Sequence, residues 1–260
     1  MIMTEEEPRI QTESDLAPAD VVVEMHHIHK AFDGHVVLKD INLSLRKGEN
    51  LVIIGKSGTG KSVLIKCIIG LIDSDEGTLT ILGEDISTLK EKPLAELRKK
   101  IGFLFQSGAL YDSMTVRQNL EFPLLRQSTV PTRKEVDVLV AEALQNVGLS
   151  DAIEKSTTEL SGGMRKRLGL ARTLILKPEI MLYDEPTTGL DAITSREISK
   201  LIIEVQKKQK TSSIIITHDI ECARLTADRV IVLNEGVCVA EGSFEELKHS
   251  GDEWVRSFFE

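Results

Sequence analysis

Short apolar runs alternate along the chain with segments of helical character. The apolar runs expected to be strands cover residues 21–25, 36–45, 50–54, 77–82, 101–105, 180–183 and 213–217. The segments expected to be helices cover residues 62–71, 193–209 and 220–226. Strands that alternate with helices predict an α/β fold with a mainly parallel sheet, covered on both faces and joined by right-handed crossovers.

A stretch over residues 106–165 interrupts this alternation and is expected to form an inserted helical subdomain. Thr115 with Gln118, and Thr132 with Glu135, match the capping-box pattern that satisfies free amides at a helix start. After Thr132, apolar residues recur at helical spacing through position 147. The remaining core is expected to comprise residues 21–105 and 166–248.

Composition and charge narrow the class of protein. The 260 residues are 41% hydrophobic and 28% charged, as in ordinary globular proteins, and no apolar run approaches the roughly 18–20 residues that span a bilayer. The net charge is −9, of which −6 lies in residues 1–24, so the rest is mildly acidic. We therefore expect no nucleic-acid partner, because such proteins usually carry a basic patch. The three cysteines form no CxxC pair, and the first residues do not resemble a secretory signal, which indicates a cytosolic chain.

The two ends of the chain have compositions of their own. Residues 1–20 are acidic and poor in apolar side chains, so we expect a disordered tail. Residues 249–260 form a C-terminal extension in which Trp254 and Phe258 would share one helix face. This face either docks on the chain's own core or contacts a partner.

A glycine-rich loop follows the strand predicted at 50–54 and precedes the helix predicted at 62–71. Its residues fit the pattern GxxxxGK[ST] at every fixed position, in the context that this phosphate-binding loop requires. Glycines let successive backbone amides point inward, and the helix start adds positive potential. The residues expected to contact nucleotide phosphates here are Gly55, Lys56, Ser57, Gly58, Thr59, Gly60, Lys61, Ser62 and Val63.

A second apolar strand, over residues 180–183, ends in two acids. Asp184 is expected to hold Mg²⁺ together with the Ser62 hydroxyl, and Glu185 is expected to orient or deprotonate the attacking water. Two carboxylates beside a triphosphate require a divalent cation between them, so Mg²⁺ is part of this prediction.

Four further segments resemble those of the ATP-binding cassette (ABC) ATPases. Leu160-Ser161-Gly162-Gly163-Met164 resembles the family signature, Gln106 follows a strand as the Q-loop glutamine does, and His218 follows a strand as the switch histidine does. Residues 188–191 resemble the D-loop. All the motifs occur in family order, over about residues 21–248. The resemblance implies a P-loop NTPase fold with an antiparallel β portion beside the parallel core.

The resemblance also implies roles for these residues. Ser161, Gly162 and Gly163 would bind the γ-phosphate of ATP held by a second copy of the chain, and Asp191 would lie at the seam between the copies. Gln106 would contact Mg²⁺ and the attacking water, and His218 would contact the γ-phosphate. With one phosphate loop and one signature, the chain would act as a head-to-tail homodimer that hydrolyses ATP.

Two positions depart from the usual family pattern, and one basic run needs an interpretation. Phe32 replaces the tyrosine that usually stacks on adenine; the alternative is a core phenylalanine. Met164 replaces the commoner glutamine, which leaves the backbone amides intact. We interpret Arg165-Lys166-Arg167 as a solvated helix face with one structural arginine.

The residues after Gln106 indicate which transporter the chain serves. The segment Phe105–Val116, with LSGGM, resembles the ATPase subunits of Mla/Mce-type phospholipid transporters. This implies a transmembrane permease, a periplasmic or membrane-anchored lipid-binding subunit, and a peripheral position on the cytoplasmic side of the inner membrane. Ala109, Leu110 and Tyr111 would offer an apolar cleft to a permease helix, unless they pack only within the subdomain.

Other functions remain open at this point. The chain could serve lipoprotein release or amino-acid uptake instead. It could also be a soluble cassette outside transport, although translation factors of this superfamily typically carry two cassettes in one chain. A binding module without hydrolysis is disfavoured because Glu185 and His218 are both present.

Overall fold

The computed structural model describes residues 20–259, so the predicted acidic tail, apart from Asp20, lies outside the described residues. Within this part of the chain, ten strands form one sheet in the order β5-β4-β1-β2-β10-β9-β3-β8-β7-β6. The strands are β1 (Val21–Phe32), β2 (His35–Arg46), β3 (Asn50–Ile54), β4 (Glu76–Ile81), β5 (Glu84–Asp85), β6 (Ile101–Leu104), β7 (Ile180–Asp184), β8 (Ser212–Ile216), β9 (Arg229–Asn234) and β10 (Val237–Gly242).

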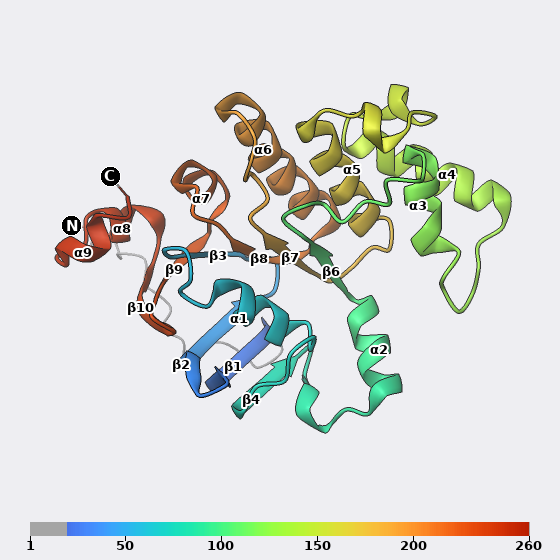
Figure 1. The fold of residues 1–260 in the computed structure, drawn as a ribbon. Helices are drawn as coiled ribbons and strands as arrows, with labels where there is room; N and C mark the ends of the chain where they lie inside the picture. Colours follow the sequence, from blue (N-terminus) through green and yellow to red (C-terminus); the bar gives the residue numbers. More distant parts are fainter. Residues whose placement is uncertain (1–19, 260) are drawn as a thin grey trace, which may run out of the picture.

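The helices of the described residues surround this sheet (Figure 1). They are α1 (Lys61–Ile68), α2 (Glu91–Lys99), α3 (Val116–Leu124), α4 (Arg133–Asn146), α5 (Gly162–Leu174), α6 (Ala192–Gln209), α7 (Ile220–Thr226), α8 (Phe244–Lys248) and α9 (Glu253–Arg256). Short 3₁₀ helices occur at Ile86–Thr88, Ser150–Ala152 and Thr157–Glu159.

The sheet combines a parallel core with an antiparallel portion, which confirms the predicted fold class. Strands β6, β7, β8, β3 and β9 pair in parallel, whereas β1 pairs antiparallel with β2 and β4, and β9 with β10. All five residues of β3 and of β8 are buried, as expected for strands covered on both faces. A parallel pairing of Val237 with Asp40 joins the two portions.

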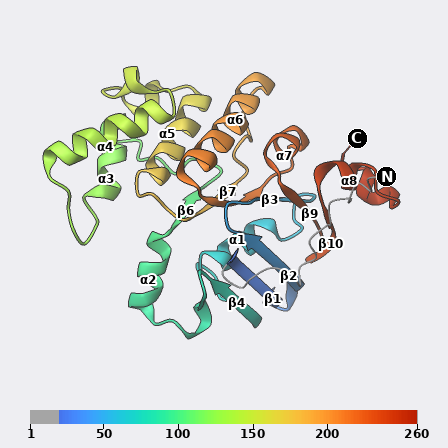
Figure 2. The ribbon, with the colours of Figure 1, turned by 180° about the vertical axis from the view of Figure 1, so that it is seen from behind.

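Helix α1 lies between the parallel strands and the antiparallel strands, as the two opposite views show (Figures 1 and 2). Its buried side chains Leu64, Ile65 and Ile68 belong to one apolar cluster with residues of β1, β2, β3 and β8. Because α1 is fixed on two sides, the loop that precedes it is held in a constant position.

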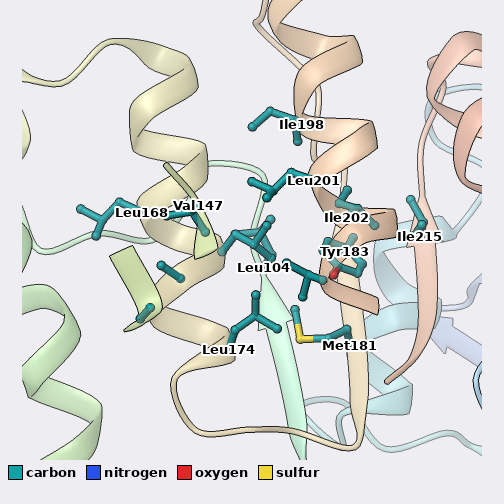
Figure 3. Close-up of a cluster of buried hydrophobic side chains, with 14 of the residues drawn as sticks. Leu104, Val147, Leu168, Leu174, Met181, Tyr183, Ile198, Leu201, Ile202 and Ile215 are labelled. Atoms are coloured by element: carbon teal, nitrogen blue, oxygen red, sulfur yellow. The ribbon is translucent and has the colours of Figure 1, made fainter. Parts of the chain in front are cut away.

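The opposite face of the parallel strands carries α5, α6 and α7. Alternate residues of β3 face the two clusters: Leu51 and Ile53 point toward α1, and Val52 and Ile54 belong to the other cluster. In that second cluster, Leu168 of α5 and Leu201 of α6 converge with side chains of β7 (Figure 3). One packed core therefore connects the parallel strands to the signature segment at the start of α5.

Helices α3 and α4 begin at the predicted positions. Thr115 caps α3 and Thr132 caps α4, each in a complete capping box with Gln118 and Glu135, so both sequence predictions are confirmed. Helix α5 runs without interruption from Gly162 to Leu174 and therefore crosses the predicted boundary between subdomain and core at residue 165.

Several elements were not predicted. The sequence interpretation omitted α2, β9, β10 and α8, and it ended β1 at Met25, although the strand continues to Phe32 through a bulge at which His27 has a φ of 53°. None of the helices described between residues 20 and 259 combines the length and apolar content needed to cross a bilayer.

The C-terminal extension docks on the chain's own core. The rings of Trp254 and Phe258 stack edge to face with their centroids 4.7 Å apart, and the ring centroids of Phe259 and Phe244 lie 5.1 Å apart. Phe259 is buried, and the other two aromatic side chains of the extension pack against the cluster that contains α5 and α6. Of the two predicted uses of this face, contact with the core is the one that the structure shows.

Candidate nucleotide site

The phosphate loop connects β3 to α1 along a path that only glycine can follow at two positions. A Cβ atom on Gly55 would lie 2.4 Å from the Leu233 carbonyl oxygen. Gly60 has a φ of 100°, in the left-handed region, and a Cβ atom there would lie 2.9 Å from Leu38. The loop is therefore pressed against β2 and β9, which fixes the direction of its amides.

The first turn of α1 has no side-chain cap. Gly60 is its N-cap residue and makes no side-chain hydrogen bond, so the free amides of the first turn are available to an anion. Lys61 Nζ instead donates to the carbonyl oxygens of Gly55, at 2.6 Å, and Lys56, at 2.8 Å. Burial lowers the pKa of Lys61, and the nearby carboxylates of Glu185 and Asp184 oppose that shift.

The loop opens into a pocket of about 460 Å³. The pocket is lined by Val37, Ser57, Gly58, Gly60, Lys61, Ser62, Gln106, Glu185 and His218. Segments that are widely separated in sequence thus meet at the carboxyl ends of β3, β6, β7 and β8, where parallel sheets place their ligands. Val37 was not among the predicted site residues; it lines the pocket because β2 passes beside Gly60.

Glu185 is held in an unusual backbone conformation. Its φ of 51° is left-handed, which costs about 1–3 kcal/mol for a residue other than glycine and is typical of functional sites. The Glu185 amide donates to the Ile216 carbonyl at 2.9 Å. Its Oε2 accepts from Thr188 Oγ1 at 3.1 Å and lies 2.8 Å from His218 Nδ1. Within residues 20–259, Oε1 takes no part in a hydrogen bond, and Glu185 lines the pocket.

Asp184 meets the requirements of a magnesium ligand. Its Oδ1 is buried and has no hydrogen-bond partner in the described part of the chain. Burial, and then the charge of Glu185, raise the pKa of Asp184, whereas Lys66, Lys61 and Lys166 lower it. A buried oxygen without a partner is costly unless something binds it, and a hydrated Mg²⁺ would satisfy it.

The structure offers oxygen donors, rather than a preformed cage, for this cation. No group of three or more His, Cys, Asp or Glu side chains among residues 20–259 is arranged to hold a metal. The predicted ligands Ser62 and Gln106 both line the pocket, and Asp184 ends β7 close to the lysine of the loop. Mg²⁺ characteristically completes such a partial set with phosphate oxygens and water.

The signature residues lie apart from this pocket. Ser161 caps α5 by accepting from the Met164 amide at 3.3 Å, and both Ser161 and Gly162 are exposed. A Cβ atom on Gly163 would lie 2.5 Å from Thr194, so the start of α5 packs tightly against the start of α6. Of the residues that the structure describes, none from 160–164 lines the pocket of the same chain.

Asp191 and Phe32 likewise do not line the pocket. Asp191 caps α6, accepting from the amides of Ile193 and Thr194 and from the Thr194 hydroxyl, and these hydrogen bonds lower its pKa. Phe32 ends β1 with 42% of its surface exposed, so the alternative of a core phenylalanine is wrong. Lys30 Nζ lies 5.3 Å from the Phe32 ring centre.

Sequence reasoning missed Lys166, and the interpretation of residues 165–167 as a solvated face is wrong for it. Lys166 is only 6% exposed, and its Nζ donates to the carbonyl oxygens of Gln106 and Glu185. The signal was the helical spacing, because Lys166 lies three residues from the buried Gly163 and three from the buried Gly169. Burial lowers the pKa of Lys166, against the charges of Glu185 and Asp184.

The segment after Gln106 lies along α5. Arg172 Nη1 donates to the Ala109 carbonyl at 2.6 Å, and its guanidinium lies 5.6 Å from the Tyr111 ring centre. The Tyr111 ring also packs on Phe122 at 4.7 Å, yet Tyr111 is 42% exposed. The predicted apolar surface therefore packs within the subdomain and still presents part of an aromatic ring to solvent.

Comparison with known proteins gives consistent matches. The ABC transporter family matches residues 38–188. A probable ribonucleotide transport ATP-binding protein, mkl, of Mycobacterium bovis is 40% identical over 97% of this chain and 69% of its own length. The methionine import ATP-binding protein MetN of Rhizobium johnstonii is 38% identical over 90% of this chain and 64% of its own length.

Solved structures agree with these matches. The cbiO1 protein from Clostridium perfringens, part of the ABC transporter complex cbiONQ, superposes with a TM-score of 0.83 and 31% identity, covering 92% of this chain and 94% of its own. The ATP-binding cassette MJ0796, a dimer in a post-hydrolysis state with ADP and Pi, superposes with a TM-score of 0.78 and 30% identity, covering 85% and 98%.

Proposed function

This chain belongs to the ABC transporter family and is an ATPase, and from that premise we propose that it powers a membrane permease that moves phospholipids in the cell envelope. The observation that carries the catalytic part is the pocket that joins the phosphate loop to Gln106, Glu185 and His218. The lipid client rests on two segments, Phe105–Val116, which begins with FQSGAL, and the LSGGM signature of residues 160–164.

Nucleotide binding is assigned to the phosphate loop. The loop amides and the uncapped first turn of α1 bind the phosphates, and Lys61 leaves its two carbonyl partners to contact the β- and γ-phosphates. Phe32, exposed at the end of β1, stacks on the adenine.

Ser62, Gln106 and Asp184 hold Mg²⁺, which neutralises phosphate charge when it is bound. The buried Oδ1 of Asp184 supports this assignment, because it lacks a hydrogen-bond partner within the described residues. Burial of such an oxygen is unfavourable unless a ligand binds it.

Glu185 orients or deprotonates the attacking water. Because His218 and Thr188 hold its Oε2, the free Oε1 accepts the proton as the water oxygen bonds to the γ-phosphorus. The bond between the γ-phosphorus and the bridging oxygen breaks, which releases ADP and phosphate. His218 fixes the Glu185 rotamer and contacts the γ-phosphate.

The active form is a head-to-tail homodimer. Ser161, Gly162 and Gly163 lie outside the pocket of their own chain, and two of them are exposed, which suits a contact with ATP in a second copy. Asp191 lies at the same seam. ATP stabilises the closed dimer, and loss of the γ-phosphate releases it.

The partner is a transmembrane permease that docks on Ala109, Leu110 and Tyr111 at the cytoplasmic face of the inner membrane. The exposed part of the Tyr111 ring supports this surface. A lipid-binding subunit completes the complex on the other side. The relatives named for ribonucleotide transport and methionine import make those solutes the competing clients.

Isolation of the complex tests the client. The chain is tagged, the complex is purified from membranes, and co-purifying proteins and lipids are identified by mass spectrometry. We expect a permease, a single-pass lipid-binding protein and bound phospholipid, with ATP-dependent transfer of a fluorescent phospholipid between vesicles. A solute-binding receptor together with ATP-dependent uptake of methionine or ribonucleotide would replace the lipid assignment.

A further inference from the structure

The buried ammonium of Lys166 joins three parts of the molecule that are far apart in sequence. Lys166 belongs to the signature helix α5, and its Nζ donates to the Gln106 carbonyl and, at 3.2 Å, to the Glu185 carbonyl. Its 6% exposure means that the charge has few other ways to be solvated. Both acceptors are backbone atoms of residues assigned above to water activation.

The contact with Glu185 stabilises a residue whose backbone conformation is unfavourable. Glu185 has a left-handed φ of 51°, and its amide is already fixed by Ile216 on β8. Lys166 fixes the carbonyl on the other side of the same residue. The two bonds together determine the direction in which the Glu185 side chain leaves the backbone.

The contact with Gln106 belongs to a longer attachment along α5. Arg165 pairs with Asp112 at 2.9 Å, Arg172 donates to the Ala109 carbonyl, and a Cβ atom on Gly169 would lie 3.2 Å from the Gly108 carbonyl oxygen. The segment after Gln106 and the signature helix are therefore fixed to each other over several turns, and Lys166 extends this attachment to Glu185.

We propose that Lys166 is a positioning residue that sets the Gln106 and Glu185 backbones relative to the signature helix, so that movement of this helix adjusts water activation. Lys166 is not among the residues that line the nucleotide pocket, and it acts through the two carbonyl groups. The proposal rests on the catalytic roles assigned above to Gln106 and Glu185, and it does not depend on the lipid client.

Lys166→Met tests this role, because methionine fills similar space but donates no hydrogen bond. We expect kcat for ATP hydrolysis to fall about 30-fold, since small displacements of catalytic groups cost up to about 100-fold, whereas the Kd for ATP changes less than about threefold. Lys166→Gln keeps an amide donor on a shorter side chain, so its kcat should lie between those of wild type and Lys166→Met. Lys200→Met removes an exposed lysine from α6 and serves as the matched control.

The outcomes separate the possibilities. The positioning role is supported if kcat decreases from wild type through Lys166→Gln to Lys166→Met while the Kd for ATP stays constant. Wild-type kcat in either variant overturns it, and so does a parallel loss of kcat and ATP affinity, which indicates a merely structural lysine. If Lys166→Met fails to fold, Lys166→Gln alone decides by the same criteria. Glu185→Gln is measured in parallel: turnover there would refute the catalytic assignment itself, whereas an inactive Glu185→Gln beside a fully active Lys166→Met refutes only the role of Lys166.

Discussion

The first turns of α1 and α5 differ in their capping and in their position relative to the pocket. The first turn of α1 has no side-chain cap and opens into a pocket with Glu185 and His218. The first turn of α5 is capped by Ser161, and that end of the helix lies outside the pocket of its own chain. Both starts combine small residues with free amides, yet only the start of α1 shares a pocket with Glu185 and His218.

This difference fits the head-to-tail homodimer proposed above, in which each copy contributes one helix start to a shared nucleotide site. An uncapped helix start is stabilised by an anion, and here the pocket provides the space for one. A capped and exposed helix start is stable alone and available for a second contact. In that proposal the two helix starts are the two halves of a nucleotide site, and within one chain they do not line the same pocket.

The largest effect is expected at the phosphate loop. Lys61→Ala should weaken ATP binding at least about 100-fold and abolish turnover, because a charge-assisted contact of about 3 kcal/mol to the phosphates is lost. Lys47→Ala removes an exposed lysine from the turn that precedes β3, outside the pocket, and is the control. Titration with a fluorescent ATP analogue measures both, and wild-type affinity in Lys61→Ala would remove this lysine from the site.

The signature start should affect turnover rather than binding. Ser161→Asp preserves the cap of α5 but places a negative charge where a partner's γ-phosphate would lie, so we expect kcat to fall about 100-fold at nearly constant ATP affinity. Ser161→Asn keeps the cap without the charge and should lose much less activity. Equal activity in the two variants would show that no phosphate approaches Ser161.

A smaller effect concerns stability. Because burial raises the pKa of Asp184, its charged form is disfavoured in the protein without nucleotide. Asp184→Asn should therefore raise the melting temperature by about 2 °C while abolishing turnover. Thermal unfolding without nucleotide or Mg²⁺ measures the shift, with the exposed Asp73→Asn as control. A lower melting temperature would mean that Asp184 supports the fold rather than a ligand.

The smallest effect is pH-dependent. Hydrogen bonds from Thr194 and from the start of α6 hold the pKa of Asp191 below its ordinary value of 3.8. The ionised cap therefore stabilises the fold above that value, and this contribution is lost as the pH falls through the depressed pKa. Asp191→Asn keeps the cap geometry, so its stability deficit in urea unfolding should be largest at neutral pH and disappear as the pH falls through the depressed pKa. A deficit independent of pH would contradict this cause.

The parts of the site that depend on local sequence were predictable. The phosphate loop, the two acids at the end of β7 and the helix caps at Thr115 and Thr132 each follow from a few neighbouring residues. Lys166 was misjudged because a basic run is normally solvated, and only tertiary packing of α5 against the Gln106 segment buries it. Strands β9 and β10 were overlooked, and the length of β1 depends on a bulge at His27 whose backbone conformation no local pattern indicated.

The proposed ATP-dependent homodimer, with one nucleotide site shared between two copies, is tested most directly by the mass of the ATP-bound protein. Glu185→Gln is expected to bind ATP without hydrolysing it. It should therefore run as a dimer with ATP and as a monomer without it in size-exclusion chromatography with light scattering. Adding Ser161→Asp should return the ATP-bound protein to a monomer. A Glu185→Gln protein that stays monomeric with ATP bound, or a wild-type monomer that hydrolyses ATP at full rate, would contradict the account.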